Sequence, residues 1–483
     1  QAASVWPRPP SAMRAARALL ALGVALPGPV RSSRGTAVVR PVANTSSFGG
    51  GLQGFTFPYL DGPRVLFGSD VASDKGSWQS ALLVFHGQEA AQVVNSSTPI
   101  LGTQPGRFVA FGDFSISQSG EGSVGFAATV DVAGATLDGV YVTSPSIPRG
   151  GAVPVVTTQG AEGYLSFREP TVAVLRGGQK LLVTCVASKG HSHAAVLLSE
   201  VDLATRVAGK PRTLIETGDV IPGSGGLPFL CLFTPSVNSD GVVVFFGSHC
   251  STTGSPAIAA QAARHAVERL RRRSSHCLHL GADRVWPGIF AARVGMPLQV
   301  VASASTPIPS GVKGELFKAF SSPALGADGT VAFVGEGSTS LGVYAAAPGG
   351  GLRLVASTRT LAAAGGRFQD FPEPPSVGCG RVAFYAVVSG GLSGVYLEGA
   401  GAMPAAMPKP VPLLTLQDRA LGAGIVYVGF GRQAYNETTN EVAAYLVLDD
   451  EAETDGVYVV SGGRAMGHLG LACPSQAVTG LLV

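Results

Sequence analysis

Charged residues are scarce in this chain of 483 residues, since Asp, Glu, Lys and Arg make up 13% of it and the formal net charge is only +3. So weak a charge excludes the basic surface that binds nucleic acid and the polybasic patch that binds a membrane. No later stretch reaches the roughly 18 consecutive apolar residues of a membrane-spanning helix. We therefore expect a monomer with no nucleic-acid partner and no membrane span.

Helical patterns are also rare, whereas the chain holds 66 glycines and 33 prolines. This composition is typical of an all-β protein rich in turns. The length exceeds the usual size of a single hydrophobic core, so either several domains or a repeat array is required.

The repeat is clearest between Gly314 and Thr358. Phe317 and Phe320 belong to a short apolar run, and Asp328-Gly329 follows as a hairpin turn. A continuous apolar strand, a Gly-Val-Tyr strand and a fourth short strand complete the unit. Ordering about 50 residues costs about 1–2 kcal/mol each, and one buried aromatic side chain returns only about 1.5–3 kcal/mol. Such units must therefore stack on one another.

Seven units of this kind follow one another between residues 36 and 460. The apolar pair that opens a unit is Phe111 and Phe114 in the second unit, Leu230 and Phe233 in the fourth, and Leu413 and Leu416 in the seventh. Val426–Val428 and Gly456–Tyr458 supply the next two strands of the seventh unit, which has no clear fourth strand of its own. A spare strand of the missing type, residues 37–43, precedes the first unit.

A closed ring accounts for both ends of this pattern, because the N-terminal strand completes the last unit and leaves no open sheet end. The spacing is typical of propeller blades. We therefore predict an all-β fold, a seven-bladed β-propeller of four-stranded antiparallel blades that is closed by an N-terminal strand. An open β-solenoid and a string of small sandwiches are the alternatives.

Three segments lie outside this pattern. Residues 1–35 contain upstream residues followed by a basic start and a short apolar core, which are typical of a secretory signal. A disordered Ala-rich terminus is the alternative. Residues 248–287 interrupt the fourth unit with a predicted basic helix, which either binds a partner or is an insertion without a role. Residues 461–483 form a C-terminal tail. The first of these segments predicts a secreted protein.

The units resemble those of uncharacterised secreted tandem-repeat proteins of bacteria and algae. The resemblance rests on the Phe-x-x-Phe pair, the turn, the Val-Ala-Phe strand and the Gly-Val-Tyr strand, and it covers roughly residues 37–460. It implies a propeller-like fold and no established activity or catalytic residue.

Cysteines and glycosylation sequons supply the first candidate sites. Cys250 and Cys277 bracket the insertion and could form a disulfide bond, with buried free thiols as the alternative. The neighbouring histidines fit no common zinc module. Asn44, Asn95 and Asn436 lie in sequons compatible with a secreted glycoprotein.

An acidic run before Gly456 is the one candidate metal site. Its carboxylates could hold calcium, but they lack the order of ligands found in an EF-hand, so a solvated loop is the simpler interpretation. We predict no other cofactor. The residues of the run are Asp449, Asp450, Glu451, Glu453 and Asp455.

The sequence does not determine the function. The first hypothesis is a secreted, non-enzymatic propeller whose loops bind a protein or a glycan, which the scarcity of charged residues favours. The second is a carbohydrate-active hydrolase or lyase, which requires titratable residues that converge at the mouth of the central channel. A structural surface component is the third. Catalytic residues cannot be assigned from the sequence.

Overall fold

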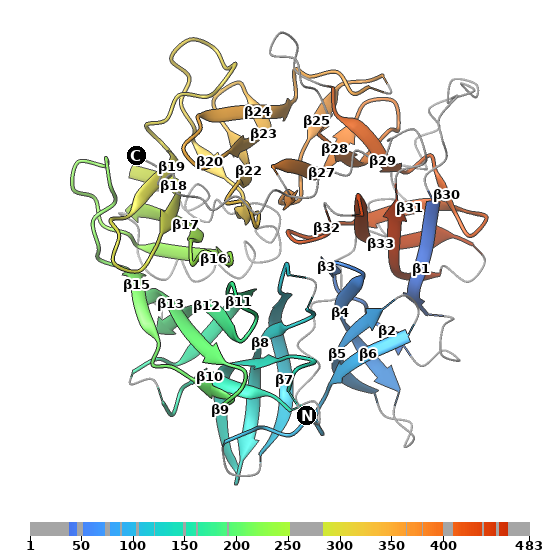
Figure 1. The fold of residues 1–483 in the computed structure, drawn as a ribbon. Helices are drawn as coiled ribbons and strands as arrows, with labels where there is room; N and C mark the ends of the chain where they lie inside the picture. Colours follow the sequence, from blue (N-terminus) through green and yellow to red (C-terminus); the bar gives the residue numbers. More distant parts are fainter. Residues whose placement is uncertain are drawn as a thin grey trace.

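The computed structural model describes residues 38–461 except 46–51, 73–77, 87–88, 103–105, 120, 148–150, 161–162, 191–192, 252–283, 364, 379, 399–408, 437–438 and 451–453. Within these residues every regular element is a β-strand. Seven antiparallel sheets stand around a common centre as the blades of a seven-bladed β-propeller (Figure 1). The predicted fold class is confirmed.

The strands of each blade lie side by side, from an inner strand near the centre of the ring to an outer strand at its rim (Figure 1). Blade 1 contains β2 (Leu52–Gln53), β3 (Tyr59–Asp61), β4 (Arg64–Ala72), β5 (Trp78–His86) and β6 (Glu89–Val94). Blade 2 contains β7 (Gly106–Ile116), β8 (Val124–Val132), β9 (Ala135–Thr143) and β10 (Val153–Thr157). Blade 3 contains β11 (Ser166–Val174), β12 (Lys180–Lys189), β13 (His193–Asp202), β14 (Val207–Ala208) and β15 (Arg212–Glu216).

The other four blades repeat this order. Blade 4 contains β16 (Cys231–Val237), β17 (Val243–Ser251), β18 (Arg284–Ala292) and β19 (Gln299–Ser303). Blade 5 contains β20 (Ala319–Phe320), β21 (Ala324–Leu325), β22 (Val331–Glu336), β23 (Leu341–Ala346) and β24 (Leu352–Ser357). Blade 6 contains β25 (Phe368–Asp370), β26 (Ser376–Gly378), β27 (Arg381–Val388), β28 (Gly394–Leu397) and β29 (Val411–Thr415). Blade 7 contains β30 (Arg419–Ala420), β31 (Ala423–Gly429), β32 (Tyr435–Asn436), β33 (Glu441–Asp449) and β34 (Asp455–Ser461).

The ring closes through its first strand, as predicted. β1 (Val38–Asn44) pairs antiparallel with β34, from Val38 opposite Ser461 to Asn44 opposite Gly456. The outermost strand of blade 7 therefore comes from the opposite end of the chain. This pairing satisfies the backbone groups of β34 that would otherwise form an exposed sheet edge.

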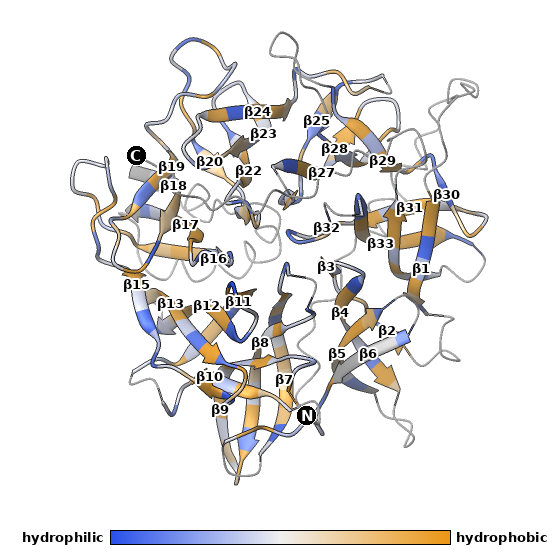
Figure 2. Ribbon diagram, in the orientation of Figure 1, coloured by the Kyte–Doolittle hydropathy of each residue, from blue (hydrophilic) through white to orange (hydrophobic). Residues whose placement is uncertain are grey.

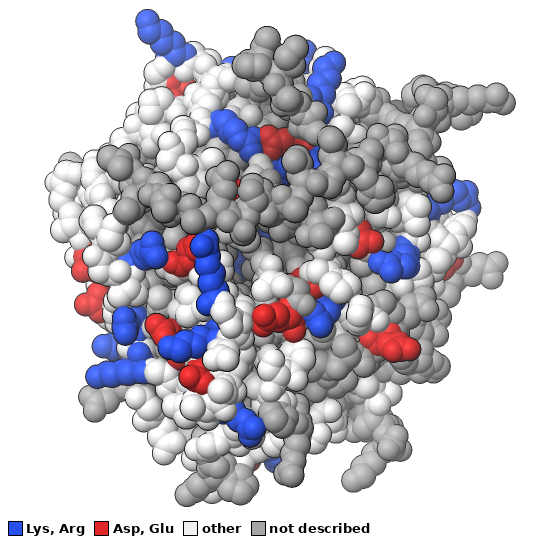
Figure 3. Space-filling model, in the orientation of Figure 1, with Lys and Arg blue, Asp and Glu red and all other residues white. Residues whose placement is uncertain are grey.

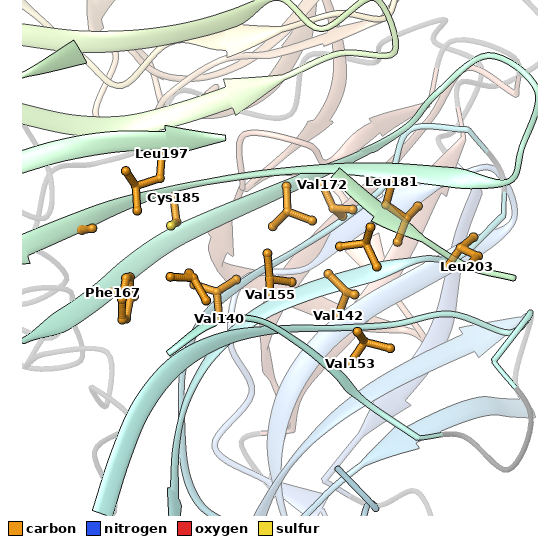
Figure 4. Close-up of a cluster of buried hydrophobic side chains, with 14 of the residues drawn as sticks. Val140, Val142, Val153, Val155, Phe167, Val172, Leu181, Cys185, Leu197 and Leu203 are labelled. Carbon is orange, nitrogen blue, oxygen red and sulfur yellow. The ribbon is translucent and has the colours of Figure 1, made fainter. Parts of the chain in front are cut away.

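The hydrophobic core is divided among the seven interfaces between neighbouring blades, because each sheet has a neighbour on both faces. One cluster packs Val140 and Val153 of blade 2 against Phe167 and Leu181 of blade 3 (Figure 4). Another packs Val42 of β1 with residues of blades 7 and 1. Figure 2 shows apolar residues along the strands and hydrophilic residues in the turns. Burial on both faces explains why the strands read as continuous apolar runs.

The aromatic pair that opens a unit is displaced from the predicted position in two blades. In blade 5 the pair is Phe317 and Phe320, as predicted, and Phe317 meets Tyr344 edge to face. The residue with the same contact in blade 4 is Phe229, which meets Phe290. In blade 2 it is Phe108, which meets Tyr141. The pairs chosen from the sequence in these two blades therefore start one and three residues too late.

The glycine of the Gly-Val-Tyr strand allows the outer strand to approach closely. A Cβ atom at Gly342 would lie 2.6 Å from the carbonyl oxygen of Ala356, and one at Gly139 would lie 2.8 Å from that of Val156. A Cβ atom at Gly394 would overlap the carbonyl oxygen of Leu414. The outer strand has a register shift at each of these places. The glycine of the Gly-Val-Tyr motif is therefore explained by a β-bulge in the outer strand, which leaves no room for a Cβ atom.

The seventh unit was assigned incorrectly from the sequence. Val411–Thr415 is the outer strand of blade 6, not the first strand of blade 7. Ala423–Gly429 is an inner strand of blade 7, and Glu441–Asp449 is its second long strand. The error arose because the unit opens with Tyr427 and Phe430, and tyrosine takes the place of the first phenylalanine.

The insertion in blade 4 starts later and ends earlier than residues 248–287. β17 continues to Ser251, β18 begins at Arg284, and these two residues are paired. The connection therefore leaves from the ends of two adjacent strands. The predicted helix lies outside the described residues.

Candidate functional site

The inner strand of every blade is irregular at the same place. In blades 2, 3 and 4 the ladder shifts register, for example between Arg168 and Thr171 and between Phe233 and Ser236. In the other four blades the inner strand is divided into two separate strands. A proline follows the irregularity in five blades, and its missing N–H removes one ladder hydrogen bond. These prolines are Pro58, Pro170, Pro235, Pro323 and Pro374.

One residue per blade stands at this irregularity, two positions after the second apolar residue of the opening pair. We call these seven residues the channel ring, because the inner strands surround the centre of the propeller. Its members are Phe57, Asp113, Glu169, Thr234, Ser322, Glu373 and Arg432. Asp113 is exposed, and the other six are half-buried. Figure 3 shows acidic and basic side chains next to one another near the middle of one face.

Neighbouring ring residues are joined by hydrogen bonds from backbone to side chain. The N–H of Glu169 donates to Oδ2 of Asp113 at 3.1 Å. The N–H of Thr234 donates in turn to Oε2 of Glu169. Each carboxylate thus accepts the backbone N–H of the next blade. No other hydrogen bond of these two carboxylates involves a described residue, so each keeps one oxygen for another donor.

The backbone is strained to make these bonds. Glu169 has a φ of 52° and Thr234 a φ of 48°, in the left-handed region that residues with a Cβ seldom adopt. Such conformations cost about 1–3 kcal/mol each and are found mostly at functional sites.

Arg432 crosses from blade 7 toward this acidic side of the ring. Its guanidinium donates to the carbonyl oxygen of Thr234 at 3.4 Å, although blades 7 and 4 are not neighbours. The phenol of Tyr59 and the carboxylate of Glu169 also lie within its electrostatic reach. Residues of five blades are therefore linked through Glu169, namely Tyr59, Asp113, Thr234, Arg432 and Glu169 itself.

The pKa of Glu169 is raised in this environment. Burial is the largest cause, although part of the residue stays exposed, and the nearby carboxylate of Asp113 raises it further. Arg432, Arg168 and the N–H of Thr234 lower it, but they do not outweigh the first two effects. Burial also raises the pKa of the Tyr59 phenol. The site therefore sets a carboxyl group that holds its proton more tightly than usual next to a second carboxylate.

The acidic run is divided by the fold. Asp449 ends β33, Asp450 accepts the N–H of Thr454 at 2.7 Å through Oδ1, and Asp455 accepts the hydroxyl of Tyr445 at 2.8 Å. The structure does not describe Glu451 and Glu453. In the part of the chain that it does describe, no group of three or more His, Cys, Asp or Glu is arranged to hold a metal ion. Calcium binding here stays a prediction.

The three sequon asparagines differ in their surroundings. Asn44 is only 7% exposed, and Asn436 is 5% exposed and donates to the carbonyl of Gly62 at 2.7 Å. A glycan on either residue would have to displace buried contacts. Asn95 is half-buried in a turn, where its Oδ1 accepts the N–H of Ser97 at 2.9 Å. Of the three, Asn95 is the most favourable acceptor, and its glycosylation stays a prediction.

The predicted disulfide bond lies outside the described residues, since neither Cys277 nor the side chain of Cys250 is described. Cys185 is a free thiol, and burial raises the pKa of both Cys185 and Cys231. Among the described residues no helix is long and apolar enough to cross a membrane.

The channel ring was not identified from the sequence. Its members share a position but not a residue type, so no motif marks them. The available signal was the place of each residue in the repeat, five positions after the first apolar residue of the opening pair. Because that residue was misplaced in blades 2, 4 and 7, the ring could not be aligned.

Comparisons with known proteins do not identify a function. A model for a family of unknown function, DUF7453, matches residues 282–415. No curated protein matches the sequence. A puromycin-hydrolyzing peptidase from Mycobacterium tuberculosis is similar in structure with a TM-score of 0.38 at 12% identity, over 88% of this chain and 63% of that one, so this chain spans less than two thirds of it. An α-L-arabinofuranosidase of Fusarium graminearum has a TM-score of 0.33 at 8% identity, and an α-L-arabinanase of Penicillium chrysogenum has 0.35 at 8%. Both cover 89% of this chain and 98% of their own. These similarities are too distant to carry an argument about function.

Proposed function

We propose that this protein is a secreted β-propeller that binds a glycan at the channel ring. The observation that carries the proposal is that Asp113 and Arg432, from blades 2 and 7, both lie within electrostatic reach of Glu169 in blade 3. Secretion rests on the signal-like segment of the first 35 residues.

A glycan matches the chemistry of this point better than a protein surface does. Sugar hydroxyl groups donate and accept hydrogen bonds, so one ligand satisfies both the carboxylate oxygens and the guanidinium. The strained backbone at Glu169 and Thr234 holds these groups in place before binding, which reduces the entropy lost on association. A protein partner would instead contact the loops at the rim of the ring.

Binding can be tested with a panel of oligosaccharides, using thermal unfolding and titration calorimetry. A ligand at 100 times its Kd stabilises the folded state by about 2.7 kcal/mol. We expect such a shift for the native protein, its loss in Asp113→Asn combined with Glu169→Gln, and its retention in Asp131→Asn. Asp131 is a partly exposed aspartate of the same blade that pairs with Arg107 at 3.8 Å. A panel without any binder, or binding that survives the double substitution, would overturn the proposal.

Hydrolysis of the glycan is the second candidate, because the raised pKa of Glu169 favours it. A carboxyl group with a raised pKa next to a second carboxyl group is an arrangement that glycosidases use as acid and base. Glu169 would give its proton to the leaving oxygen, while water, activated by Asp113, adds to the anomeric carbon. Release of reducing ends that Glu169→Gln abolishes would support hydrolysis. A glycan recovered intact after long incubation would exclude hydrolysis and leave binding as the only proposed function.

A further inference from the structure

Arg168 is the one residue beside the channel ring that departs from the repeat. It occupies the position just before the ring residue of blade 3. In the other six blades this position holds an uncharged residue: Thr56, Gly112, Phe233, Ser321, Pro372 and Gly431. The propeller forms in those blades without a charge there, so the fold does not require the guanidinium.

The guanidinium of Arg168 is held in place by an aromatic ring. Its Cζ lies 5.2 Å from the centroid of the Phe233 ring, in a cation–π contact between blades 3 and 4. Phe233 is itself stacked on Phe246, with centroids 6.1 Å apart and planes at 28°. Arg168 is exposed, and the carboxylate of Glu169 lies within its electrostatic reach. Arg432 differs, because it already donates to the carbonyl of Thr234.

A guanidinium stacked on a ring by its face can present its N–H edge to a planar, bidentate acceptor. Carboxylates fit this geometry, and lysine does not reproduce it. Arg168 precedes Glu169 in the chain, so the two Cα atoms are about 3.8 Å apart. A sugar bound through its hydroxyl groups at Asp113 and Glu169 thus lies within reach of the Arg168 side chain.

We propose that Arg168 recognises the carboxylate of an acidic glycan, so that the ligand of the channel ring is a chain containing uronic acid. This inference rests on the proposed function and names its ligand class. The carboxylates of Asp113 and Glu169 fix the orientation, because they repel the ligand's carboxylate and accept its hydroxyl groups. The acidic group therefore lies on the Phe233 side.

A galacturonic acid oligomer and the same oligomer with its carboxyl groups reduced to alcohols test the inference. We expect the native protein to bind the acidic oligomer at least tenfold more tightly, with a preference that falls as salt rises. Arg168→Gln should bind both oligomers equally, Arg168→Lys should keep part of the preference, and Phe233→Leu should reduce it. Arg107→Gln, which removes an arginine 74% exposed on blade 2, should change nothing. Circular dichroism and thermal unfolding verify that each variant is folded.

Two results would overturn the inference while leaving glycan binding intact. The first is equal affinity of the native protein for the two oligomers, with binding still lost on Asp113→Asn and Glu169→Gln. The second is a preference for the acidic oligomer that Arg168→Gln retains. If neither these oligomers nor any other glycan binds, both this inference and the proposed function are wrong.

Discussion

Phe317 and Tyr344 meet edge to face in blade 5, with ring centroids 5.0 Å apart and planes at 88°. The same contact recurs at nearly the same geometry in blades 2, 4 and 6. Gly335 of β22 lies beneath the two rings, where a Cβ would overlap Phe317 and come within 3.1 Å of Tyr344. The contact therefore joins the segment before β20 to the third strand, β23, over Gly335 of the strand between them.

Removing one ring of this contact should destabilise the whole propeller. We expect Phe317→Ala to lower the free energy of unfolding by about 3–5 kcal/mol, because it removes buried apolar surface and leaves a cavity. Leu316→Ala is the matched control, since Leu316 is adjacent but 41% exposed, and it should change stability by no more than about 0.5 kcal/mol. Denaturant unfolding followed by fluorescence measures both values. Similar losses for the two variants would contradict the role given to the contact.

The glycines beneath the outer strands lead to a prediction about ring closure. A Cβ at Gly456 would overlap the carbonyl oxygen of Ala43 on β1 and lie 2.6 Å from Cβ of Asn44. Gly394 has the same environment within blade 6. We expect Gly456→Ala and Gly394→Ala each to cost about 1–3 kcal/mol through overpacking.

The position of the two glycines separates their effects. Only Gly456→Ala strains the strand that closes the ring, so only that variant should increase proteolytic cleavage near β1. Limited proteolysis followed by mass spectrometry of the N-terminal fragments distinguishes the two. Equal cleavage in both variants would show that β1 is not held more weakly than an ordinary outer strand.

The fold could be predicted from the sequence because its main determinants repeat. Phe317, Tyr344 and Gly342 have counterparts in other units, and stacking of blades buries each unit on both faces. The spare strand before the first unit indicated closure, which the pairing of Val38 with Ser461 confirms. The sequence prediction was wrong where another residue type takes the same structural position, as Tyr427 does at the place of the first phenylalanine of a unit.

The candidate site could not be predicted in the same way. Asp113, Glu169 and Arg432 occupy one position of the repeat but differ in residue type, and the strained φ of Glu169 leaves no mark on the sequence. Arg432 and Thr234 are 198 residues apart, and only the closed ring brings them together. The acidic run predicts a calcium site because its members are close in sequence. In the structure, however, Asp450 bonds a backbone N–H and Asp455 bonds a tyrosine hydroxyl.

Glu315 gives a prediction that depends on pH. The carboxylate accepts the N–H groups of Thr339 at 2.6 Å, Ser340 at 3.0 Å and Val312 at 3.2 Å. Burial by itself raises the pKa of Glu315, but these hydrogen bonds outweigh it and lower the pKa to about 2. A lowered pKa in the folded state stabilises the protein above the ordinary pKa of about 4.3, and this stabilisation is lost as pH falls toward 2.

We therefore expect Glu315→Gln to cost about 1.5–3 kcal/mol at pH 7, the scale of hydrogen bonds to a charged group. The difference from the native protein should narrow between pH 5 and pH 2. Glu200→Gln is the control, because Glu200 is 49% exposed and only pairs with Lys180 at 3.5 Å. Denaturant unfolding at pH 7, 4 and 2.5 measures the effect. A difference that stays constant with pH would show that the loss is not due to the charge.

Glu169 should behave in the opposite way. Its pKa is raised in the folded state, so the folded protein binds more protons than the unfolded chain above about pH 4. Stability contributed by this residue is then present at low pH and lost as pH rises through the folded pKa. Glu169→Gln removes the charge and keeps an oxygen that can accept the N–H of Thr234. We expect this variant to be more stable than the native protein at pH 7 and equal to it near pH 4.

Asp113→Asn separates the two causes of the raised pKa. It removes the neighbouring negative charge but not the burial, so it should reduce the pH dependence only in part. Thermal unfolding between pH 4 and pH 8 measures how the stability of the native protein and of each variant changes with pH. Enhanced stability of Glu169→Gln together with lost glycan binding would identify a residue kept for function at the expense of stability. If instead Glu169→Gln is less stable at every pH, the carboxylate is a structural link between blades, and the channel ring loses its central residue as a binding site.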